Sequence, residues 1–233
     1  MAIPFNQRLE TICREKNNSL CIGLDIDPDK FLSGTDTSLT GMESFGKDVI
    51  DATIDFCPVY KPNFAFFERF GSQGFALLER LVAHINGRAI VIADAKRGDI
   101  GNTSHQYATA ILDGMGCDAI TISPYMGRDA IKPFIKNPEK GVFILAVTSN
   151  QSASEIQEHG NQSSPLFKKV IQISMELNTY DNIGLVVGAT KTDVMEEVRE
   201  LSNGLPWLIP GVGTQGGGLE TALRISHNNG IGI

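Results

Sequence analysis

Apolar residues occur in seven short runs that are separated by longer amphipathic stretches. The runs cover residues 20–24, 59–64, 89–93, 119–122, 142–147, 183–187 and 207–210. Each run has the length of a strand, and most are rich in β-branched residues. Apolar and polar residues do not alternate within them. This is the pattern of strands that are buried on both faces of a parallel sheet.

The amphipathic stretches between these runs carry helix signals. Ser164 followed by Pro165 resembles an N-cap with proline at the first helical position. Thr192 is followed by acids at Asp193 and Glu196, which suit the first turn of a helix. Residues 6–16 predict an additional helix before the first strand.

The order of these elements predicts a (β/α)8 TIM barrel formed by residues 1–233 as a single domain. Seven strand–helix units are followed by a further apolar start at residues 230–233, where the sequence given stops. We therefore expect the eighth strand and its closing helix to be cut off, which leaves the barrel C-terminally incomplete. A doubly wound open sheet is the alternative fold. In a barrel, the functional residues lie at the carboxyl ends of the strands.

Composition and charge narrow the class of protein. The formal net charge is −7, which argues against a nucleic-acid-binding surface. Neither an apolar run of membrane-spanning length nor a signal-peptide core is found, so we expect a cytoplasmic protein without a membrane partner. The four cysteines are not in CxxC spacing and the four histidines are scattered, so we expect reduced thiols and no metal site.

Charged side chains gather at the predicted strand ends. Asp94, Lys96 and Asp99 follow the third apolar run, and Asp25 and Lys61 close the first and second. Because side chains alternate along a strand, Asp94 and Lys96 share one face, where Asp25 and Lys61 can join them. Acids and amines interleaved in this way keep one another ionised despite burial. The alternative interpretation is a structural ion pair or a solvated turn.

A glycine-rich segment, PGVGTQGGG, follows the seventh run. Gly211, Gly213 and Gly216 match GxGxxG, but too little chain follows for a dinucleotide-binding unit. A phosphate site formed by backbone N–H groups is the favoured interpretation, and a flexible turn is the alternative. The long polar loop at residues 150–164 follows the fifth run, and we expect it to act as a lid.

Seven segments together resemble the orotidine 5′-phosphate decarboxylase family, in particular its longer bacterial subgroup. These are GLDIDP, KPNFAFFE, DAKRGDIGNT, SPYMG, VTSN, VVGAT and PGVGTQGG, and they occur in the family's order over essentially the whole chain. The resemblance implies a barrel dimer that decarboxylates orotidine 5′-monophosphate to UMP in de novo pyrimidine biosynthesis, without a cofactor or metal. The substrate would be a small nucleotide.

The resemblance also implies catalytic roles for the charged cluster. Asp25 would hold the ribose, and Lys61 would bridge the ribose and the acidic network. Asp94 would lie against the departing carboxylate, and Lys96 would stabilise the C6 carbanion and protonate it. Asp99 would reach into the active site of the partner subunit.

Further binding residues follow from the same resemblance. Ile100 and Thr103 would join Asp99 in the partner's site, which makes the active sites of the homodimer shared. Ser149 would contact the pyrimidine. Gln215, with the backbone of Gly216 and Gly217, would bind the phosphate.

One departure from the family pattern concerns the C-terminal segment. The family carries an arginine on its eighth strand that clamps the phosphate, and this sequence stops about where that strand begins. We expect unpaired edges on the first and seventh strands, instability and weakened nucleotide binding in a chain that stops there. Two alternative functions stay open: a metal-dependent sugar-phosphate aldolase or decarboxylase relative, which carries an acid at the position of Lys61, and a non-catalytic nucleotide-binding remnant.

Overall fold

A computed structural model describes residues 2–161, 164–211, 219–225 and 230–232. Its eight strands form one parallel sheet in the order β1 to β8, in which each strand pairs with the next along the chain. The strands are β1 (Cys21–Leu24), β2 (Val59–Pro62), β3 (Ile90–Arg97), β4 (Ala119–Ile122), β5 (Gly141–Val147), β6 (Ile183–Val187), β7 (Trp207–Ile209) and β8 (Gly230–Gly232). The predicted (β/α)8 barrel is confirmed, and the open doubly wound sheet is excluded.

The expectation of a missing eighth strand is wrong. β8 pairs with β7 in register, with Ile231 opposite Leu208, and Gly232 forms a parallel bridge with Leu20. The N–H of Gly232 donates to the carbonyl of Ser19 at 3.1 Å. Three residues are enough because Ile231 packs into the barrel interior, where it is 2% exposed. The edge of β7 is therefore paired along β8, and β8 reaches the start of β1 through one bridge, so the predicted unpaired edges are not observed.

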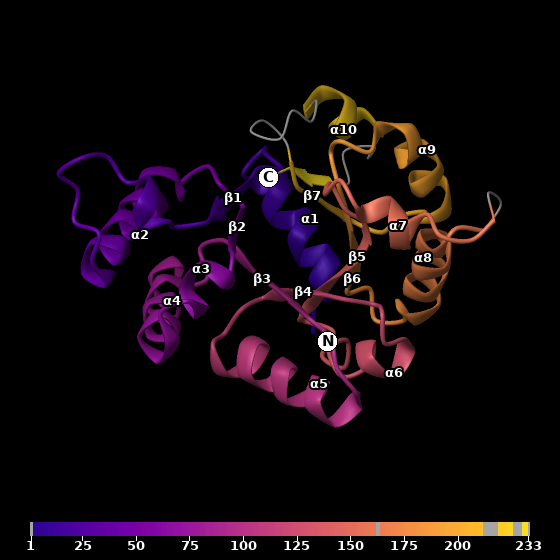
Figure 1. The fold of residues 1–233 in the computed structure, drawn as a ribbon, viewed down its shortest axis with the longest axis horizontal. Helices are drawn as coiled ribbons and strands as arrows, with labels where there is room; N and C mark the ends of the chain where they lie inside the picture. Colours follow the sequence, from indigo (N-terminus) through magenta and orange to yellow (C-terminus); the bar gives the residue numbers. More distant parts are fainter. Residues whose placement is uncertain (1, 162–163, 212–218, 226–229, 233) are drawn as a thin grey trace.

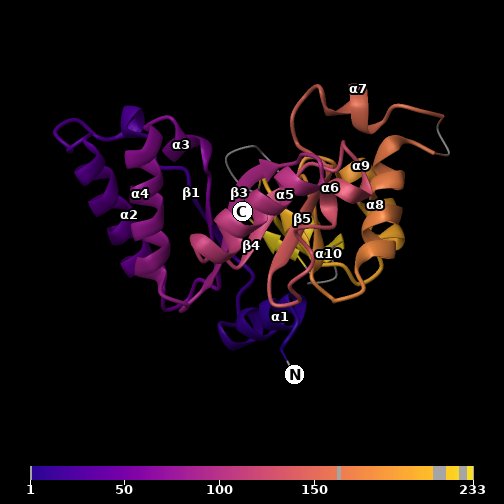
Figure 2. The same cartoon turned by 90° about the horizontal axis from the view of Figure 1, so that it is seen from below.

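Helices surround the barrel (Figure 1). They are α1 (Phe5–Glu15), α2 (Leu39–Thr53), α3 (Ala65–Glu68), α4 (Gly71–Ile85), α5 (Gly101–Ala108), α6 (Arg128–Ile131), α7 (Ala153–Gln157), α8 (Leu166–Leu177), α9 (Thr192–Leu201) and α10 (Leu219–Ile225). A 3₁₀ turn (Pro28–Lys30) follows β1, and a π-helical segment (Thr109–Gly114) continues α5. Figure 2 shows α1 at one end of the barrel and α7 at the other.

The barrel interior is filled by alternate residues of the strands, and α1 closes its amino end. Phe5 and Leu9 of α1 belong to the same buried cluster as Val59, Ile92 and Phe143 of the strands. The rings of Phe5 and Phe143 meet edge to face at 6.0 Å. The predicted N-terminal helix therefore forms and covers the amino end of the barrel interior, and the interior opens at the carboxyl end.

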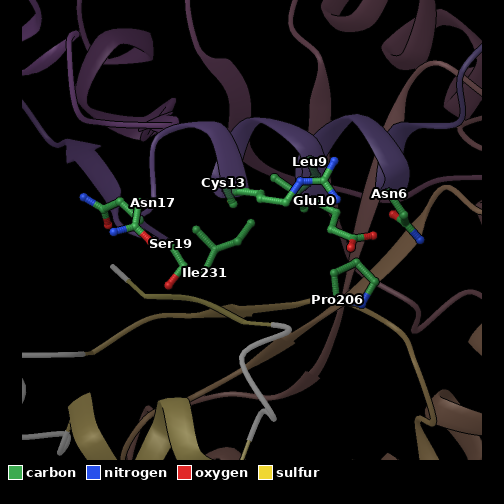
Figure 3. A pocket seen from close by; sticks show the side chains of 10 residues that line it. Asn6, Leu9, Glu10, Cys13, Asn17, Ser19, Pro206 and Ile231 are labelled. Atoms are coloured by element: carbon green, nitrogen blue, oxygen red, sulfur yellow. The ribbon is translucent and has the colours of Figure 1, made fainter.

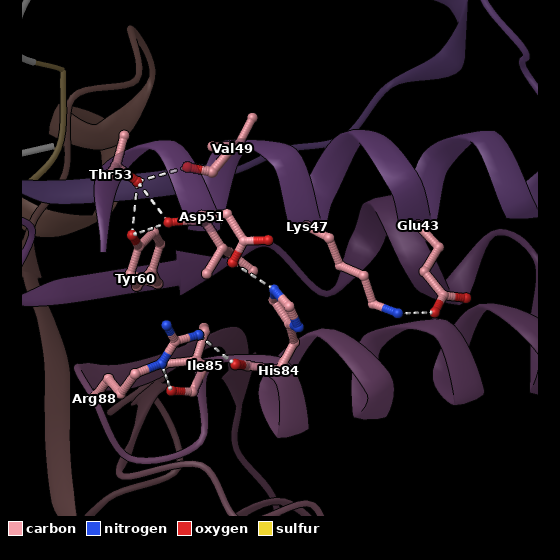
Figure 4. Close-up of polar contacts among 10 residues, drawn as sticks. Glu43, Lys47, Val49, Asp51, Thr53, Tyr60, His84, Ile85 and Arg88 are labelled. Carbon is pink, nitrogen blue, oxygen red and sulfur yellow. Dashed lines mark hydrogen bonds and ion pairs between the residues drawn. The ribbon is translucent and has the colours of Figure 1, made fainter. Parts of the chain in front are cut away.

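The second core cluster lies between the sheet and the helices, and α2 packs against α4 on this outer side. Gly46 permits the close approach, since a Cβ there would lie 2.9 Å from Cδ2 of Leu81. Polar pairs line the same seam (Figure 4), among them His84 with Asp51 at 2.7 Å. The Thr53 hydroxyl also bonds that of Tyr60, at 2.6 Å, on the outer face of β2.

Candidate active site

A cavity of about 730 Å³ opens at the carboxyl end of the barrel. Side chains or backbone from β1 to β7, or from the loops that follow them, line it. The lining consists of Gly23, Asp25, Lys30, Lys61, Asn63, Asp94, Lys96, Thr121, Leu145, Thr148, Ser149, Asn150, Gln157, Val186, Leu208, Pro210 and Gly211. The predicted residues Asp25, Lys61, Asp94, Lys96 and Ser149 are thus brought together from four segments distant in the sequence.

Asp94 lies between two lysines at the floor of this cavity. Lys61 Nζ is 2.7 Å from Asp94 Oδ2, and Lys96 Nζ is 2.5 Å from Oδ1. The side chains of Lys61 and Asp94 are 7% and 10% exposed, whereas that of Lys96 is 52% exposed. Lys61 is therefore the buried partner, and Lys96 presents its ammonium group to the open part of the cavity.

Asp94 and Lys61 hold each other in the ionised state. Burial alone would raise the pKa of Asp94, but Lys61 and Lys96 stabilise the carboxylate and hold its pKa below the ordinary value. Burial alone would lower the pKa of Lys61, but Asp94 and then Asp25 raise it above the ordinary value. At neutral pH the cavity floor therefore carries a fixed carboxylate at Asp94 beside the fixed positive charge of Lys61.

Lys96 occupies a strained position on an irregular strand. Its φ of 47° is in the left-handed region, which costs a non-glycine residue about 1–2 kcal/mol. The register between β3 and β4 shifts here, because β3 advances from Ala93 to Arg97 while β4 advances from Ile120 to Ile122. A bulge of this kind re-aims side chains near functional sites.

Two polar residues that the sequence interpretation missed support the charged groups. The amide of Asn63 donates to Asp25 Oδ2 at 3.1 Å. The Thr121 hydroxyl lies against Asp94 Oδ1 at 3.1 Å. Asn63 could have been found two residues past Lys61, directly after the end of β2. Thr121 gave a weaker signal, as the only polar residue in the run AITI.

Three predicted residues lie away from this cavity in the same chain. Of the residues that the structure describes, the cavity lining does not include Asp99, Ile100 or Thr103. They lie at the start of α5, where Asp99 Oδ1 accepts from the N–H of Ile100 at 2.7 Å. Their assignment to a partner's active site stays a prediction. Gln215, Gly216 and Gly217 lie outside the described residues.

The loop after β5 is attached to the cavity rim. Gln157 of α7 donates to Thr148 Oγ1 at 2.7 Å and accepts from the Thr148 N–H at 2.9 Å. The first half of the predicted lid, residues 150–157, therefore packs beside Ser149 at the site. Its closure over a ligand stays a prediction.

A smaller cavity of about 330 Å³ lies at the amino end, between α1 and β8 (Figure 3). Its potential nucleophile is Cys13, but burial and the neighbouring Cys57 raise the pKa of this thiol to about 11. A thiol with this pKa stays protonated at neutral pH and reacts slowly. Cys13 is therefore a poor candidate for a catalytic nucleophile.

The residues that the structure describes contain neither a metal-binding cluster nor a membrane-spanning helix. Within the described ranges, no three His, Cys, Asp or Glu side chains gather in a way that would hold a metal ion. Among the helices described, none combines the length and the apolar character needed to cross a bilayer.

Comparisons with known proteins agree with this geometry. Residues 18–228 match the model of the "Orotidine 5'-phosphate decarboxylase / HUMPS family". The orotidine 5′-phosphate decarboxylase of Natronomonas pharaonis is 44% identical over 235 residues, covering 99% of this chain and 86% of the relative. That of Dehalococcoides mccartyi is 42% identical over 230 residues, covering 97% and 83%.

Solved structures give the same answer for the fold. The OMP decarboxylase of Leishmania donovani superposes with a TM-score of 0.89 at 31% identity, covering 99% of this chain and 88% of that chain. The alignments with these relatives cover 97–99% of this chain. This chain is therefore a member of the orotidine 5′-phosphate decarboxylase / HUMPS family.

Proposed function

We propose that this protein decarboxylates orotidine 5′-monophosphate to UMP, a step of de novo pyrimidine biosynthesis. The observation that carries the proposal is the Lys61–Asp94–Lys96 cluster at the floor of the cavity, in a chain of this family. The two lysines and the aspartate supply what the reaction requires: a fixed negative charge, a fixed positive charge and a proton.

The reaction breaks the bond between C6 of the pyrimidine and its carboxylate, and the electron pair stays on C6 as CO2 leaves. The exposed ammonium of Lys96 stabilises this developing carbanion and then donates its proton to C6. Lys96 is left as a neutral amine and regains a proton from water. The product is UMP, and the electron pair of the broken bond ends in the new C6–H bond.

Asp94 acts through its fixed charge. Because its pKa is held below the ordinary value, it is a carboxylate at neutral pH and repels the carboxylate of the bound substrate. That repulsion falls as CO2 departs, so it is larger in the ground state than in the transition state. Lys61, on the other carboxylate oxygen, prevents Asp94 from turning away.

The rim of the cavity provides polar groups for the rest of the nucleotide. Asp25, with its neighbour Asn63, offers a carboxylate and an amide suited to ribose hydroxyls, and Lys61 lies between this pair and Asp94. Ser149 is placed at the rim for the pyrimidine. We assign the phosphate to Gln215 and the backbone of Gly216 and Gly217.

We further propose that the working form is a homodimer with shared sites, located in the cytoplasm. Ile100, Tyr125 and Met126 are large apolar residues that are 54%, 82% and 48% exposed. They lie near Asp99 and Thr103, in the region from which these side chains would enter the partner's cavity. The cytoplasmic location is supported by the four cysteines, which are all free thiols.

A metal-dependent sugar-phosphate relative is the second candidate, since the matched family includes more than one activity by its description. Lys61 opposes it, because an ammonium group paired with Asp94 occupies the place where a cation would have to bind. The third candidate, a non-catalytic remnant, rested on a missing eighth strand, and that strand is formed.

The test is an assay of orotidine 5′-monophosphate consumption by loss of its ultraviolet absorbance. We expect turnover by the wild-type protein and none by Lys96→Met, with UMP identified as the product. A folded wild-type protein that leaves the absorbance unchanged would refute the proposal. Conversion of a sugar phosphate only when Mg²⁺ is present would favour the second candidate.

A further inference from the structure

We propose that Thr121 is a positioning residue whose hydroxyl fixes Asp94 and Lys96 relative to each other. The inference rests on the proposed function for its catalytic meaning, although its geometric part can be tested alone. Thr121 is on β4, next to the bulge of β3, and is 1% exposed. Its hydroxyl touches both residues that the mechanism uses at C6.

The Thr121 hydroxyl makes every hydrogen bond of which it is capable. It donates to Asp94 Oδ1 at 3.1 Å, and it accepts from the N–H groups of Ala95 at 3.1 Å and Lys96 at 3.0 Å. A hydroxyl has one proton and two lone pairs, so these three contacts saturate it. A saturated, buried hydroxyl can hold its neighbours in one arrangement only.

The bulge explains why such a group is needed. Regular pairing of β3 with β4 stops after Ala93 and resumes when the N–H of Ser123 donates to the carbonyl of Arg97 at 2.8 Å. Between these points the N–H groups of Ala95 and Lys96 are bonded by Thr121 in place of a strand carbonyl. The left-handed conformation of Lys96 is unfavourable by itself, so it has to be held by contacts of this kind.

The same hydroxyl couples the backbone to the carboxylate. Lys96 Nζ and Thr121 Oγ1 share Oδ1 of Asp94, while Lys61 occupies Oδ2. The Thr121 hydroxyl therefore links the carboxylate of Asp94 to the backbone N–H of Lys96, the residue whose ammonium group binds that carboxylate. Valine at this position would keep the shape and the β-propensity but would remove all three bonds, whereas serine would keep them.

The experiment compares Thr121→Val and Thr121→Ser with wild type, and Thr53→Val is the matched control. Thr53 also loses a partly buried hydroxyl bond, but on the outer side of the barrel, against Tyr60 (Figure 4). For Thr121→Val we expect kcat to fall about 10- to 100-fold, because small misplacements of reacting groups have effects of this size. We expect UMP affinity to stay within about threefold, since the loss is confined to the transition state.

Serine should restore kcat to within about fivefold of wild type, and Thr53→Val should leave it unchanged, because only the position-121 hydroxyl acts through Asp94 and Lys96. Equal kcat for Thr121→Val and wild type would overturn the positioning role. A parallel loss in Thr53→Val would assign the effect to general destabilisation.

Crystal structures of the two position-121 variants separate this inference from the proposed function. We expect Lys96 to leave the left-handed region, or its ammonium to leave Asp94 Oδ1, in Thr121→Val but not in Thr121→Ser. An unchanged bulge in Thr121→Val would refute the inference even if the enzyme is active. If wild type does not act on orotidine 5′-monophosphate, the proposed function fails, while these structures still decide what Thr121 holds. Should Thr121→Val not fold, the Thr121→Ser variant and a Thr121→Ala variant give the same comparison.

Discussion

Methionine substitutions at Lys61 and Lys96 should separate stability from catalysis, because the two lysines bind the same carboxylate from different environments. Lys61 is 7% exposed and Lys96 is 52% exposed in their side chains. Lys61→Met leaves the buried carboxylate of Asp94 with one ion-pair partner instead of two. Breaking a buried ion pair costs about 3–5 kcal/mol. We expect about 3 kcal/mol, at the lower end of that range, because Lys96 still compensates the charge of Asp94.

Lys96→Met should have the opposite profile. Exposed ion pairs contribute about 0–1 kcal/mol, so Lys96→Met should change the free energy of unfolding by less than about 1 kcal/mol. Removing a general acid lowers rates by about 10²–10⁴, and removing the electrostatic partner of a developing anion lowers them by about 10²–10³. Together these effects predict a loss in kcat of at least about 10⁴-fold, or about 5.5 kcal/mol of transition-state stabilisation.

The assays are thermal melting, single-turnover absorbance and UMP titration. For a chain of this length, about 3 kcal/mol corresponds to a fall in Tm of about 6–12 °C for Lys61→Met, against less than about 4 °C for Lys96→Met. Lys47→Met is the matched control, since Lys47 forms an ion pair with Glu43 at 2.7 Å on the side of α2 that faces α4, away from the cavity (Figure 4). The reasoning is refuted if Lys96→Met lowers Tm more than Lys61→Met, or if it keeps kcat within tenfold of wild type.

Three further predictions concern pH, metal and assembly. The pKa of Asp94 is lowered below its ordinary 3.8, so the stability that Asp94 contributes is present above pH 3.8 and is lost as the pH falls through the lowered pKa. The pKa of Lys61 is raised above its ordinary 10.5, so the stability that Lys61 contributes is lost only as the pH rises through the raised pKa. The difference in unfolding free energy between wild type and Asp94→Asn should therefore be constant from about pH 5 to 9 and shrink below about pH 4, and a difference that already shrinks at neutral pH would contradict the assignment. Activity should be unchanged after chelation with EDTA and dialysis, and a Mg²⁺ requirement would count against the ammonium-based cluster. Mixing Lys96→Ala with Asp99→Ala should restore part of the activity through intact shared sites, and continued inactivity after proven subunit exchange would exclude them.

The hydrophobic pattern was sufficient for the fold because a parallel barrel buries both faces of its strands. Each apolar run became a strand at nearly its predicted position, and the helix at residues 6–16 appeared as Phe5–Glu15. The eighth strand was not predicted because its packing in the barrel depends on one side chain, Ile231, which joins the buried cluster of the barrel interior. A run of four residues carries too little pattern to show whether it completes a barrel.

The candidate site was predictable only in part. Alternation placed Asp94 and Lys96 on one face, and they do meet, but the strand between them is a bulge and not a regular extended segment. Thr121 was not found because its role follows from the cross-strand register of β3 and β4, which no single segment encodes. Asp99 could be assigned by resemblance alone, since its own chain places it outside the cavity.

The charges of the cavity floor also constrain how the enzyme divides its tasks. Asp25 and Asp94 balance Lys61 and Lys96, so this cluster has no net charge with which to attract a phosphorylated nucleotide. Affinity for the substrate must come from groups farther along the cavity, and that binding energy can then be used to press the reacting carboxylate toward Asp94. During the reaction the negative charge of the substrate moves from the carboxylate to C6. In the proposed mechanism a neutral cluster favours that movement only if its charges keep a fixed order, with the carboxylate anchored by Lys61 and Thr121 and Lys96 presented to the open part of the cavity. We expect the irregular backbone at Lys96 to be the feature that sets this order, because the register shift and the left-handed φ both occur at this residue.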